Sequence, residues 1–155
     1  AMRIAVFSDT HGRLDLLPEA RAHTGPVDVI LHLGDYCRDA GEVSRVFGAP
    51  CLAVRGNCDF CVDEPLMRIL EFDGVRLLCI HGHLVPDLDA LSYKAEQERC
   101  CAALFGHTHM QLVERRGNVL LVNPGSLARP RGGSAQGCAV LTIRQGEIQA
   151  QLISL

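Results

Sequence analysis

The first third of the chain alternates short apolar runs with amphipathic segments. We predict a helix over Leu14–Ala22, where Leu14, Leu17 and Ala20 recur at helical spacing, and a second helix over Asp39–Phe47. Three apolar runs flank these helices and are expected to be buried strands, at Arg3–Ser8, Val27–Leu33 and Cys51–Val54. The resulting β-α-β-α-β order predicts parallel strands joined by right-handed crossovers.

The rest of the chain has the pattern of antiparallel hairpins. Asp73-Gly74 is a strong two-residue turn signal, and Arg116-Gly117-Asn118 and Gln145-Gly146 mark two further turns. A helix over Asp87–Cys101 and a strand over Ala102–Leu104 separate the first hairpin from the second. The hairpin strands are predicted at Met67–Phe72, Val75–Ile80, Gln111–Glu114, Val119–Val122, Gly137–Ile143 and Glu147–Leu152. The predicted fold is α/β, a four-layer α/β/β/α sandwich of two mixed sheets with helices on the outer faces.

Size and composition fit a single domain over residues 1–155. Hydrophobic residues make up 48% of the 155 positions, which is enough for a packed core. The formal charge of -3 disfavours sequence-independent binding to long nucleic acids, which depends on Lys and Arg. No apolar run approaches the roughly 20 residues of a membrane-spanning helix. The start of the chain has no signal-peptide pattern, so we expect a cytoplasmic protein.

Eight cysteines are present, and we expect reduced thiols in a cytoplasmic protein with a full core. Cys51, Cys79 and Cys138 lie within apolar strands and are expected to be small core residues. Cys58 and Cys61 have the spacing of a redox or zinc motif, but the chain has no second pair to complete a structural zinc site. We therefore expect neither role for this pair.

Polar clusters follow five of the predicted strands. In α/β sheets, ligands bind outside the carboxyl ends of the strands, so these clusters are expected to meet at one edge. His107 and His109 are two positions apart, and in extended backbone they would point the same way. Imidazole is the commonest side-chain metal ligand, although this pair alone could also cap a strand. The clusters are Asp9/His11, Asp35, Asn57, His81/His83 and His107/His109.

These clusters supply more ligands than one metal ion takes. Without His83, they hold two carboxylates, one amide and four imidazoles, a total of seven. Zinc and manganese sites rarely have more than roughly four to six ligands. Two divalent ions that share a carboxylate would use all seven. Since only two of the ligands are charged, such a centre would keep an excess of about two positive charges.

The ordered motifs resemble those of the calcineurin-like metallophosphoesterase superfamily, and in particular its small YfcE-type phosphodiesterase branch. Each motif follows a predicted strand, and the resemblance extends to the Asn123-Pro124-Gly125-Ser126 loop. Five motifs in order make it highly specific. They are D-x-H from Asp9, G-D from Gly34, G-N from Gly56, H-G-H from His81 and G-H-T-H from Gly106.

The resemblance implies a two-metal phosphoesterase of small phosphate-ester substrates, with phosphodiesters as the first choice. A hydroxide bridging the metals would attack phosphorus in line, with Asp35, Asn57 and His83 as catalytic residues. Manganese is the first choice of metal because the ligands are oxygen and nitrogen without thiolate, with iron, zinc and nickel as alternatives. One metal would be held by Asp9, His11, Asp35 and His109, and the other by Asp35, Asn57, His81 and His107, with Asp35 bridging.

Position 58 departs from much of the superfamily, which has histidine after the Asn. Cys58 is a neutral thiol with an ordinary pKa of about 8.5, and is therefore a weaker proton donor. The YfcE-type branch often shares this cysteine. We expect either a preference for good leaving groups or partial compensation by His83. His83 itself would either contact the substrate phosphate or cap its strand.

Five further polar residues have either two possible roles or only a structural one. His32 is expected to be packed or to support a ligand, and His23 to lie on a helix surface. Asp59 would either support a ligand histidine or act as a turn residue. Arg129 and Arg131 would either reach the substrate phosphate or be solvated loop charges.

A non-catalytic protein-binding scaffold is the competing function. A retromer subunit of eukaryotes has this same fold and uses it as a scaffold. A scaffold can lose its histidines, whereas all seven ligand positions are filled in this chain. No membrane partner is expected, and the sequence is compatible with a homo-oligomer.

Overall fold

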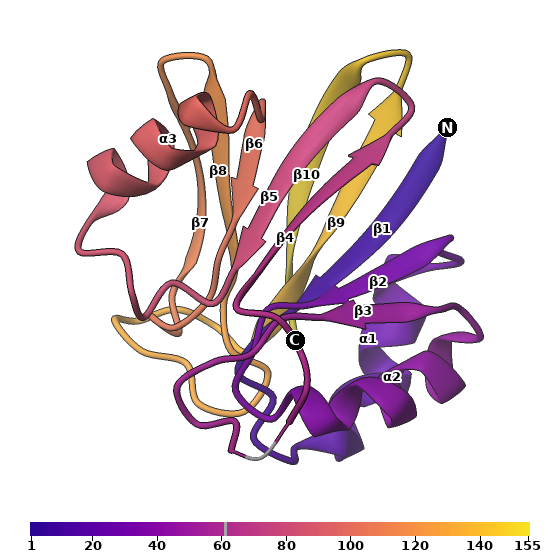
Figure 1. The fold of residues 1–155 in the computed structure, drawn as a ribbon. Helices are drawn as coiled ribbons and strands as arrows, with labels where there is room; N and C mark the ends of the chain where they lie inside the picture. Colours follow the sequence, from indigo (N-terminus) through magenta and orange to yellow (C-terminus); the bar gives the residue numbers. More distant parts are fainter. Residues whose placement is uncertain (61) are drawn as a thin grey trace.

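Two five-stranded sheets pack face to face in the computed structural model, which describes residues 1–60 and 62–155 (Figure 1). The first sheet has the order β10-β9-β1-β2-β3 and the second β4-β5-β6-β8-β7. The first consists of β1 (Met2–Phe7), β2 (Val29–His32), β3 (Cys51–Ala53), β9 (Gly137–Arg144) and β10 (Glu147–Ser154). The second consists of β4 (Met67–Phe72), β5 (Val75–Ile80), β6 (Ala102–Leu104), β7 (Gln111–Arg116) and β8 (Val119–Pro124).

Both sheets are mixed, as predicted. Strands β1, β2 and β3 run parallel, and β9 joins them antiparallel to β1. In the second sheet β5, β6 and β8 are parallel, while β4 and β7 pair antiparallel with β5 and β8. The predicted Asp73-Gly74 turn joins β4 to β5, and both of its residues have positive φ, at 46° and 82°. This is the backbone that a type I′ hairpin requires.

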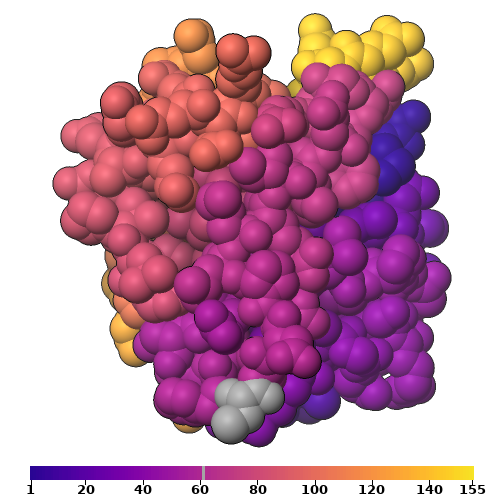
Figure 2. Space-filling model, viewed as in Figure 1, coloured from indigo at the N-terminus to yellow at the C-terminus, as the bar shows by residue number. Residues whose placement is uncertain are grey.

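In the described part of the chain, three α-helices cover the outer faces of the sheets. Helices α1 (Leu17–Thr24) and α2 (Ala40–Phe47) lie on the first sheet, and α3 (Leu88–Gln97) lies on the second (Figure 1). Figure 2 shows the indigo and purple residues of the first sheet and its helices along the right and lower side. The magenta to orange residues of the second sheet and α3 lie across the upper and left side. The α/β/β/α layering predicted from the sequence is therefore confirmed.

The main core lies between the two sheets, and it explains the continuous apolar runs. In β1, Ile4 and Val6 face the opposite sheet, while Ala5 and Phe7 face the helices. All four side chains are fully buried. A strand buried on both faces has no polar side to alternate with, so its sequence lacks the period of two. The seven cysteines in the described part of the chain are free thiols, and Cys79 and Cys138 are buried in these cores.

The predicted helices differ from the observed ones at their ends. The first begins as a 3-10 turn, Leu14–Leu16, and becomes α-helical only at Leu17, because Pro18 has no N–H to continue the preceding turn. The helix predicted to reach Cys101 ends at Gln97. Arg99 has φ 59°, and the Cys100 N–H bonds the Ala95 carbonyl at 2.8 Å, which closes α3.

A second 3-10 turn, Cys37–Asp39, precedes α2, which therefore starts one residue later than predicted. Within the described residues, no helix has the length and apolar character needed to cross a membrane. The division into one domain over residues 1–155 stays a prediction. So does the cytoplasmic location.

Candidate metal centre

The loops after β1, β2, β3, β5 and β6 meet at one end of the sandwich. Backbone hydrogen bonds join neighbouring loops, from Asp9 N–H to the Gly34 carbonyl and from Gly106 N–H to the His81 carbonyl, each at 2.9 Å. The backbone N–H of His107 donates to Asp9 Oδ2 at 3.1 Å and so connects the two sheets. The carboxyl ends of strands from both sheets therefore supply one site, as their parallel arrangement predicts.

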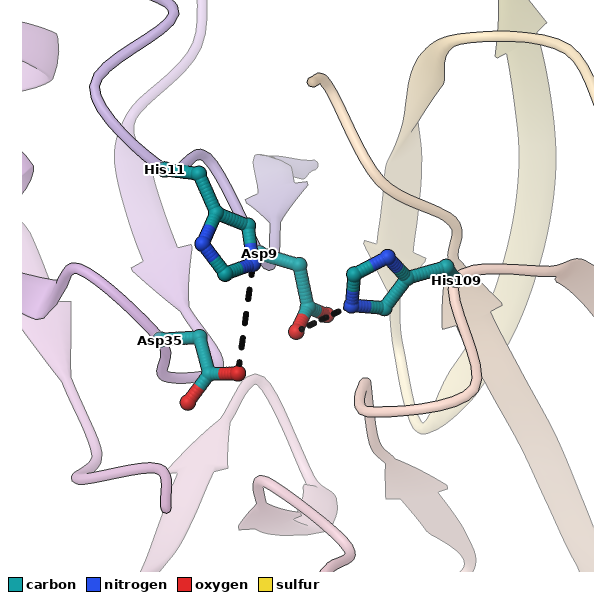
Figure 3. A group of neighbouring side chains, drawn as sticks. All are labelled: Asp9, His11, Asp35 and His109. Carbon is teal, nitrogen blue, oxygen red and sulfur yellow. Dashed lines mark ion pairs between the residues drawn. The ribbon is translucent and has the colours of Figure 1, made fainter. Parts of the chain in front are cut away.

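One group of four side chains lies together at the centre of this site (Figure 3). Each offers a ligand atom, and these atoms all lie within 4.8 Å of one another. His109 Nε2 lies 3.1 Å from Asp9 Oδ1, and His11 Nε2 lies 4.0 Å from Asp35 Oδ2. The group consists of Asp9, His11, Asp35 and His109, which are the residues that the resemblance implies for one metal.

A second group surrounds the His81 ring and shares Asp35 with the first. His81 Nε2 lies 3.4 Å from Asp35 Oδ2 and 3.8 Å from Asp9 Oδ1. His107 Nδ1 lies 3.2 Å from the same His81 nitrogen. Asp35 Oδ2 thus faces His11 on one side and His81 on the other.

Backbone carbonyls orient two of the histidines. The Nδ1 atoms of His81 and His109 lie 2.8 Å from the Leu33 carbonyl and 2.6 Å from the Arg129 carbonyl. A carbonyl oxygen can only accept, so each Nδ1 carries the proton and each Nε2 keeps its lone pair. Both Nε2 atoms point at the carboxylates. Metal-binding histidines are typically oriented in this way by a partner of the second ring nitrogen.

The backbone of the predicted ligands is strained. Nine non-glycine residues have positive φ in the described part of the chain, and five of them are predicted ligands. Their φ values are 54° for Asp9, 43° for His11, 59° for Asp35, 69° for His107 and 60° for His109. Each such residue costs on the order of 1 kcal/mol or more, and strain of this kind concentrates at functional sites.

Glycines allow the loops to approach each other closely. A Cβ at Gly56 would lie 2.3 Å from Asp35 Oδ1, and one at Gly106 would lie 1.8 Å from Ser8 Oγ. Neither space can hold a methyl group. Gly56, which precedes the predicted ligand Asn57, and Gly106, which precedes His107, are therefore required by packing against the neighbouring loop.

Asp59 is a support of this site rather than a plain turn residue. Its carboxylate accepts the backbone N–H groups of Asp35, Gly56 and Cys37 at 2.8, 2.9 and 2.9 Å. Its hydrogen bonds within the described residues are to backbone near Asp35 and Asn57, and none is to a predicted ligand histidine. Three N–H donors converging on one buried carboxylate hold the second and third loops together.

A buried hydrogen-bond network supports the first loop, and the sequence analysis did not predict it. Thr10 Oγ1 donates to Asp39 Oδ2 at 2.6 Å and lies 2.9 Å from His32 Nε2. The Gly34 N–H donates to His32 Nδ1 at 3.1 Å, so His32 is neutral and its Nε2 carries the proton. His32 is packed and also supports the Asp35 loop. No spacing signal could identify Asp39, because its partner lies 29 positions away.

The Asn123-Pro124-Gly125-Ser126 loop also supports the centre. The Ser126 hydroxyl donates to the Asp9 carbonyl at 2.8 Å. The Asn123 amide donates to the Gly106 carbonyl at 3.1 Å and to Thr108 Oγ1 at 2.9 Å. This loop therefore holds the backbone of the Asp9 motif and of the Gly106–His109 motif in place.

Burial and the neighbouring charges shift the pKa values of the site residues in opposite directions. Burial would raise the pKa of Asp35, but the His81 imidazole and the Cys58 N–H outweigh it and hold that pKa well below its usual range. The Asp9 carboxylate raises the pKa of His109. Burial lowers the pKa of His11 and of His107. The carboxylate of Asp35 is therefore ionised, and His11 and His107 are neutral, as metal ligands must be.

These residues fit a divalent metal. Asp9 Oδ1 and His11 Nε2 are buried and have no hydrogen-bond partner among the described residues. A buried carboxylate oxygen without a partner is costly, whereas a cation beside it would stabilise it. Carboxylate oxygens and imidazole nitrogens without thiolate are the ligands of manganese, iron and zinc sites.

The other predicted site residues lie at the edge of the centre. Asn57 is exposed, and its amide nitrogen lies 3.7 Å from Cys58 Sγ. The His83 ring lies 5.4 Å from the His81 ring and 6.3 Å from the His107 ring, centroid to centroid. Arg129 and Arg131 are exposed, and their backbones bond His109.

Three remaining predictions have plain outcomes. His23 is exposed on α1, as expected, and its Nδ1 lies 2.9 Å from the Glu19 carbonyl. Cys58 is exposed beside the centre, and its backbone N–H donates to Asp35 Oδ1 at 2.8 Å. Cys61 lies outside the described residues, so the expectation that these two cysteines have neither a redox nor a zinc role stays a prediction.

Comparison with known proteins agrees with this geometry. The profile of the calcineurin-like phosphoesterase superfamily domain matches residues 2–146. The chain belongs to this superfamily. A probable metallophosphoesterase of Bacillus subtilis, YsnB, is 32% identical over 92% of this chain and 85% of its own length. The phosphodiesterase YfcE of Escherichia coli is 30% identical over 84% of this chain and 66% of its own length.

Solved structures share the fold of this phosphoesterase domain. Vps29 of Entamoeba histolytica, solved in complex with zinc, matches with a TM-score of 0.76 over 97% of each chain. The two sequences are 20% identical, so this likeness shows the fold alone. The chain is therefore a metallophosphoesterase-family protein, and its described residues include a cluster that could hold a metal ion.

Proposed function

We propose that this chain hydrolyses phosphodiesters at a centre of two divalent metal ions. The observation that carries the proposal is the position of Asp35. Its Oδ2 lies 3.4 Å from His81 Nε2 and 4.0 Å from His11 Nε2, between the two groups of side chains. A carboxylate at that position would offset the repulsion between two neighbouring cations. The name of YfcE, a phosphodiesterase, supports the choice of diesters.

We propose the following roles for the residues of the site. Asp9, His11, Asp35 and His109 would hold one metal, and Asp35, Asn57, His81 and His107 the other. When bound, divalent metals supply Lewis acidity and an activated water for phosphate-ester hydrolysis. Asn57 would have to turn its amide oxygen away from solvent and toward His81. Its exposed position leaves it free to do so.

His83 would contact the substrate phosphate. Its Nδ1 is buried and has no hydrogen-bond partner among the described residues, although its ring lies beside His81 and His107. Burial lowers the pKa of His83, so the ring is neutral at pH 7 and its N–H can donate to a phosphate oxygen. This contact would orient the ester relative to the two groups of ligands.

Proton donation to the leaving group would be weak. Burial and then the Asp35 carboxylate raise the pKa of the Cys58 thiol, so it stays neutral and is a poor acid at pH 7. We propose that the chain prefers esters with good leaving groups. If Cys58→His left the rate with a poor leaving group unchanged, relative to wild type, this preference would have another cause.

The proposal is tested by hydrolysis of bis-p-nitrophenyl phosphate and p-nitrophenyl phosphate by chelator-treated protein, with and without Mn²⁺. We expect turnover only with metal and a higher kcat/KM for the diester. Asp35→Asn should lower kcat by at least about 100-fold, because it weakens both metal positions. Asp63→Asn, at an exposed carboxylate of the nearby loop, is the matched control and should leave the rate unchanged.

Iron, zinc and nickel replace Mn²⁺ in parallel reactions, since oxygen and nitrogen ligands do not select among these ions by affinity alone. Absence of turnover with all four metals and both esters would favour the non-catalytic scaffold. That outcome would indicate that this chain uses the fold to bind a protein partner and not for catalysis. Small phosphate esters remain the proposed partners, and the oligomeric state stays a prediction.

A further inference from the structure

An apolar cavity of about 340 Å³ opens beside His83 and His107. It lies between the β5–α3 loop, the start of α3 and the end of β6. Its size is at the lower end of small-molecule pockets. Its apolar walls are Val85, Pro86, Leu88, Leu91 and Phe105.

The cavity shares its histidines with the proposed metal centre. His107 is a predicted ligand, His83 is the proposed phosphate contact, and both line this cavity, so a phosphate held by His83 would lie beside it. An organic group attached to that phosphate could enter the cavity and contact its apolar walls. Phe105 and Leu91 are buried and give the cavity a rigid floor.

Two polar side chains of the lining, Asp87 and Thr108, already have partners among the described residues. Asp87 Oδ1 caps α3 by accepting the Ala90 N–H at 2.8 Å. Thr108 Oγ1 accepts from the Asn123 amide at 2.9 Å and from the Met110 N–H at 3.2 Å. The hydroxyl groups of a sugar would find few free side-chain partners here, and an unpaired buried hydroxyl is unfavourable.

We infer that this cavity binds the organic group of the substrate and selects apolar or aromatic phosphate esters over small or sugar-like ones. The inference rests on the proposed function, because it needs a phosphate at the metal centre. It goes beyond it by naming the class of ester.

Binding of non-hydrolysable phosphonates tests the inference separately from turnover. Calorimetry on Mn²⁺-loaded protein would compare phenylphosphonate, methylphosphonate and 2-hydroxyethylphosphonate. We expect phenylphosphonate to bind at least about tenfold more tightly than methylphosphonate, since it buries more apolar surface. The hydroxyethyl compound should bind no better than the methyl one.

Two variants on α3 make a matched pair. Leu88→Gln puts an amide into the cavity wall and should reduce the methyl-to-phenyl ratio of Kd values about fivefold or more. Tyr93→Gln changes an exposed side chain of the same helix outside the cavity and should leave the ratio unchanged. Val85→Thr, which keeps the shape of the side chain, is a second cavity variant and should lower the ratio in the same direction if Leu88→Gln does not fold.

Each outcome decides between the two proposals. Equal Kd values for the three phosphonates, or preference for the hydroxyethyl compound, overturns the inference and leaves the proposed function standing if bis-p-nitrophenyl phosphate is hydrolysed. An unchanged ratio in both cavity variants also overturns it. Failure of any phosphonate to bind, together with no hydrolysis, overturns both.

Discussion

Individual atoms of the candidate centre show how the chain prepares a buried group of ligands before a metal binds. The Leu33 and Arg129 carbonyls fix the protonated nitrogen of His81 and of His109. The Cys58 N–H holds Asp35 Oδ1, which leaves Oδ2 for the histidines. Each of these three predicted ligands thus keeps one atom bonded to the protein and leaves another facing the site.

Asp59 is the residue whose role the structure changes most. Its carboxylate accepts three backbone N–H groups, from Asp35, Gly56 and Cys37. An amide oxygen has less charge than a carboxylate, and an amide nitrogen facing an N–H would repel it. The side chain therefore acts as an acceptor that connects three segments of backbone.

Asp59→Asn should destabilise the protein by about 1–3 kcal/mol, because at least one buried N–H loses its acceptor. Urea unfolding measures this change, and a Mn²⁺ titration of activity should show weaker metal binding in the same variant. Asp63→Asn, an exposed aspartate four positions away, is the control and should change neither quantity. A variant with normal stability and normal metal binding would show that Asp59 does not support the loops.

At the scale of elements, short loops after buried strands carry the site. The strands are rigid because they lie inside the sandwich, and the loops are tied to each other by backbone hydrogen bonds. Helix α3 belongs to the same arrangement, since the β5–α3 loop carries His83. The start of this helix is held by the Asp87 carboxylate, which accepts the Ala90 N–H at 2.8 Å.

Asp87→Ala should lower the free energy of unfolding by about 1 kcal/mol, because it removes the N-cap of α3. Asp87→Asn keeps a side-chain oxygen at the same position and should lose only a small part of this stability. Chemical denaturation of the two variants and the wild type measures the difference. Equal loss in both variants would assign the effect to the charge of Asp87 and not to the cap.

The pattern of elements was predictable because strands, turns and helix starts have local sequence signals. The Asp73-Gly74 hairpin is one example, and the apolar run of β1 is another. The end of α3 was not, because Glu98 and Arg99 are ordinary helical residues. Its end depends on the Cys100 N–H reaching the Ala95 carbonyl and on the Cys101 N–H bonding the Arg76 carbonyl of β5.

At the scale of the whole molecule, loops from two different sheets must stay in place for the centre to exist. The contact between the His107 N–H and Asp9 Oδ2 joins them directly. The cluster also brings buried carboxylates close together, which opposes folding unless positive charge is near. Metal binding and folding are therefore expected to be coupled.

Mn²⁺ at a free concentration 100 times its Kd should stabilise the folded chain by about 2.7 kcal/mol, if it binds only the folded state. For a chain of this length we expect the midpoint of thermal unfolding to rise by about 5–10 °C. Differential scanning calorimetry with Mn²⁺ and with chelator measures the shift. Asp35→Asn should remove most of it, and an equal shift in that variant would place the metal elsewhere.

The sequence by itself determined the classes of the elements, their order and the chemistry available at each strand end. Apolar runs, turn residues and the identity of the polar residues are local properties, so they can be read without coordinates. The order of the motifs was sufficient to indicate the superfamily, and the profile match confirms it.

Only the tertiary structure decided which atoms meet. The strained φ angles of Asp9 and Asp35, the carbonyl partners of His81 and His109, and the role of Asp59 all depend on segments brought together by the two packed sheets. The apolar cavity beside His83 likewise combines a loop, a helix and a strand end. Such contacts join residues tens of positions apart, and no local pattern in the chain encodes them, because folding of the whole domain creates them.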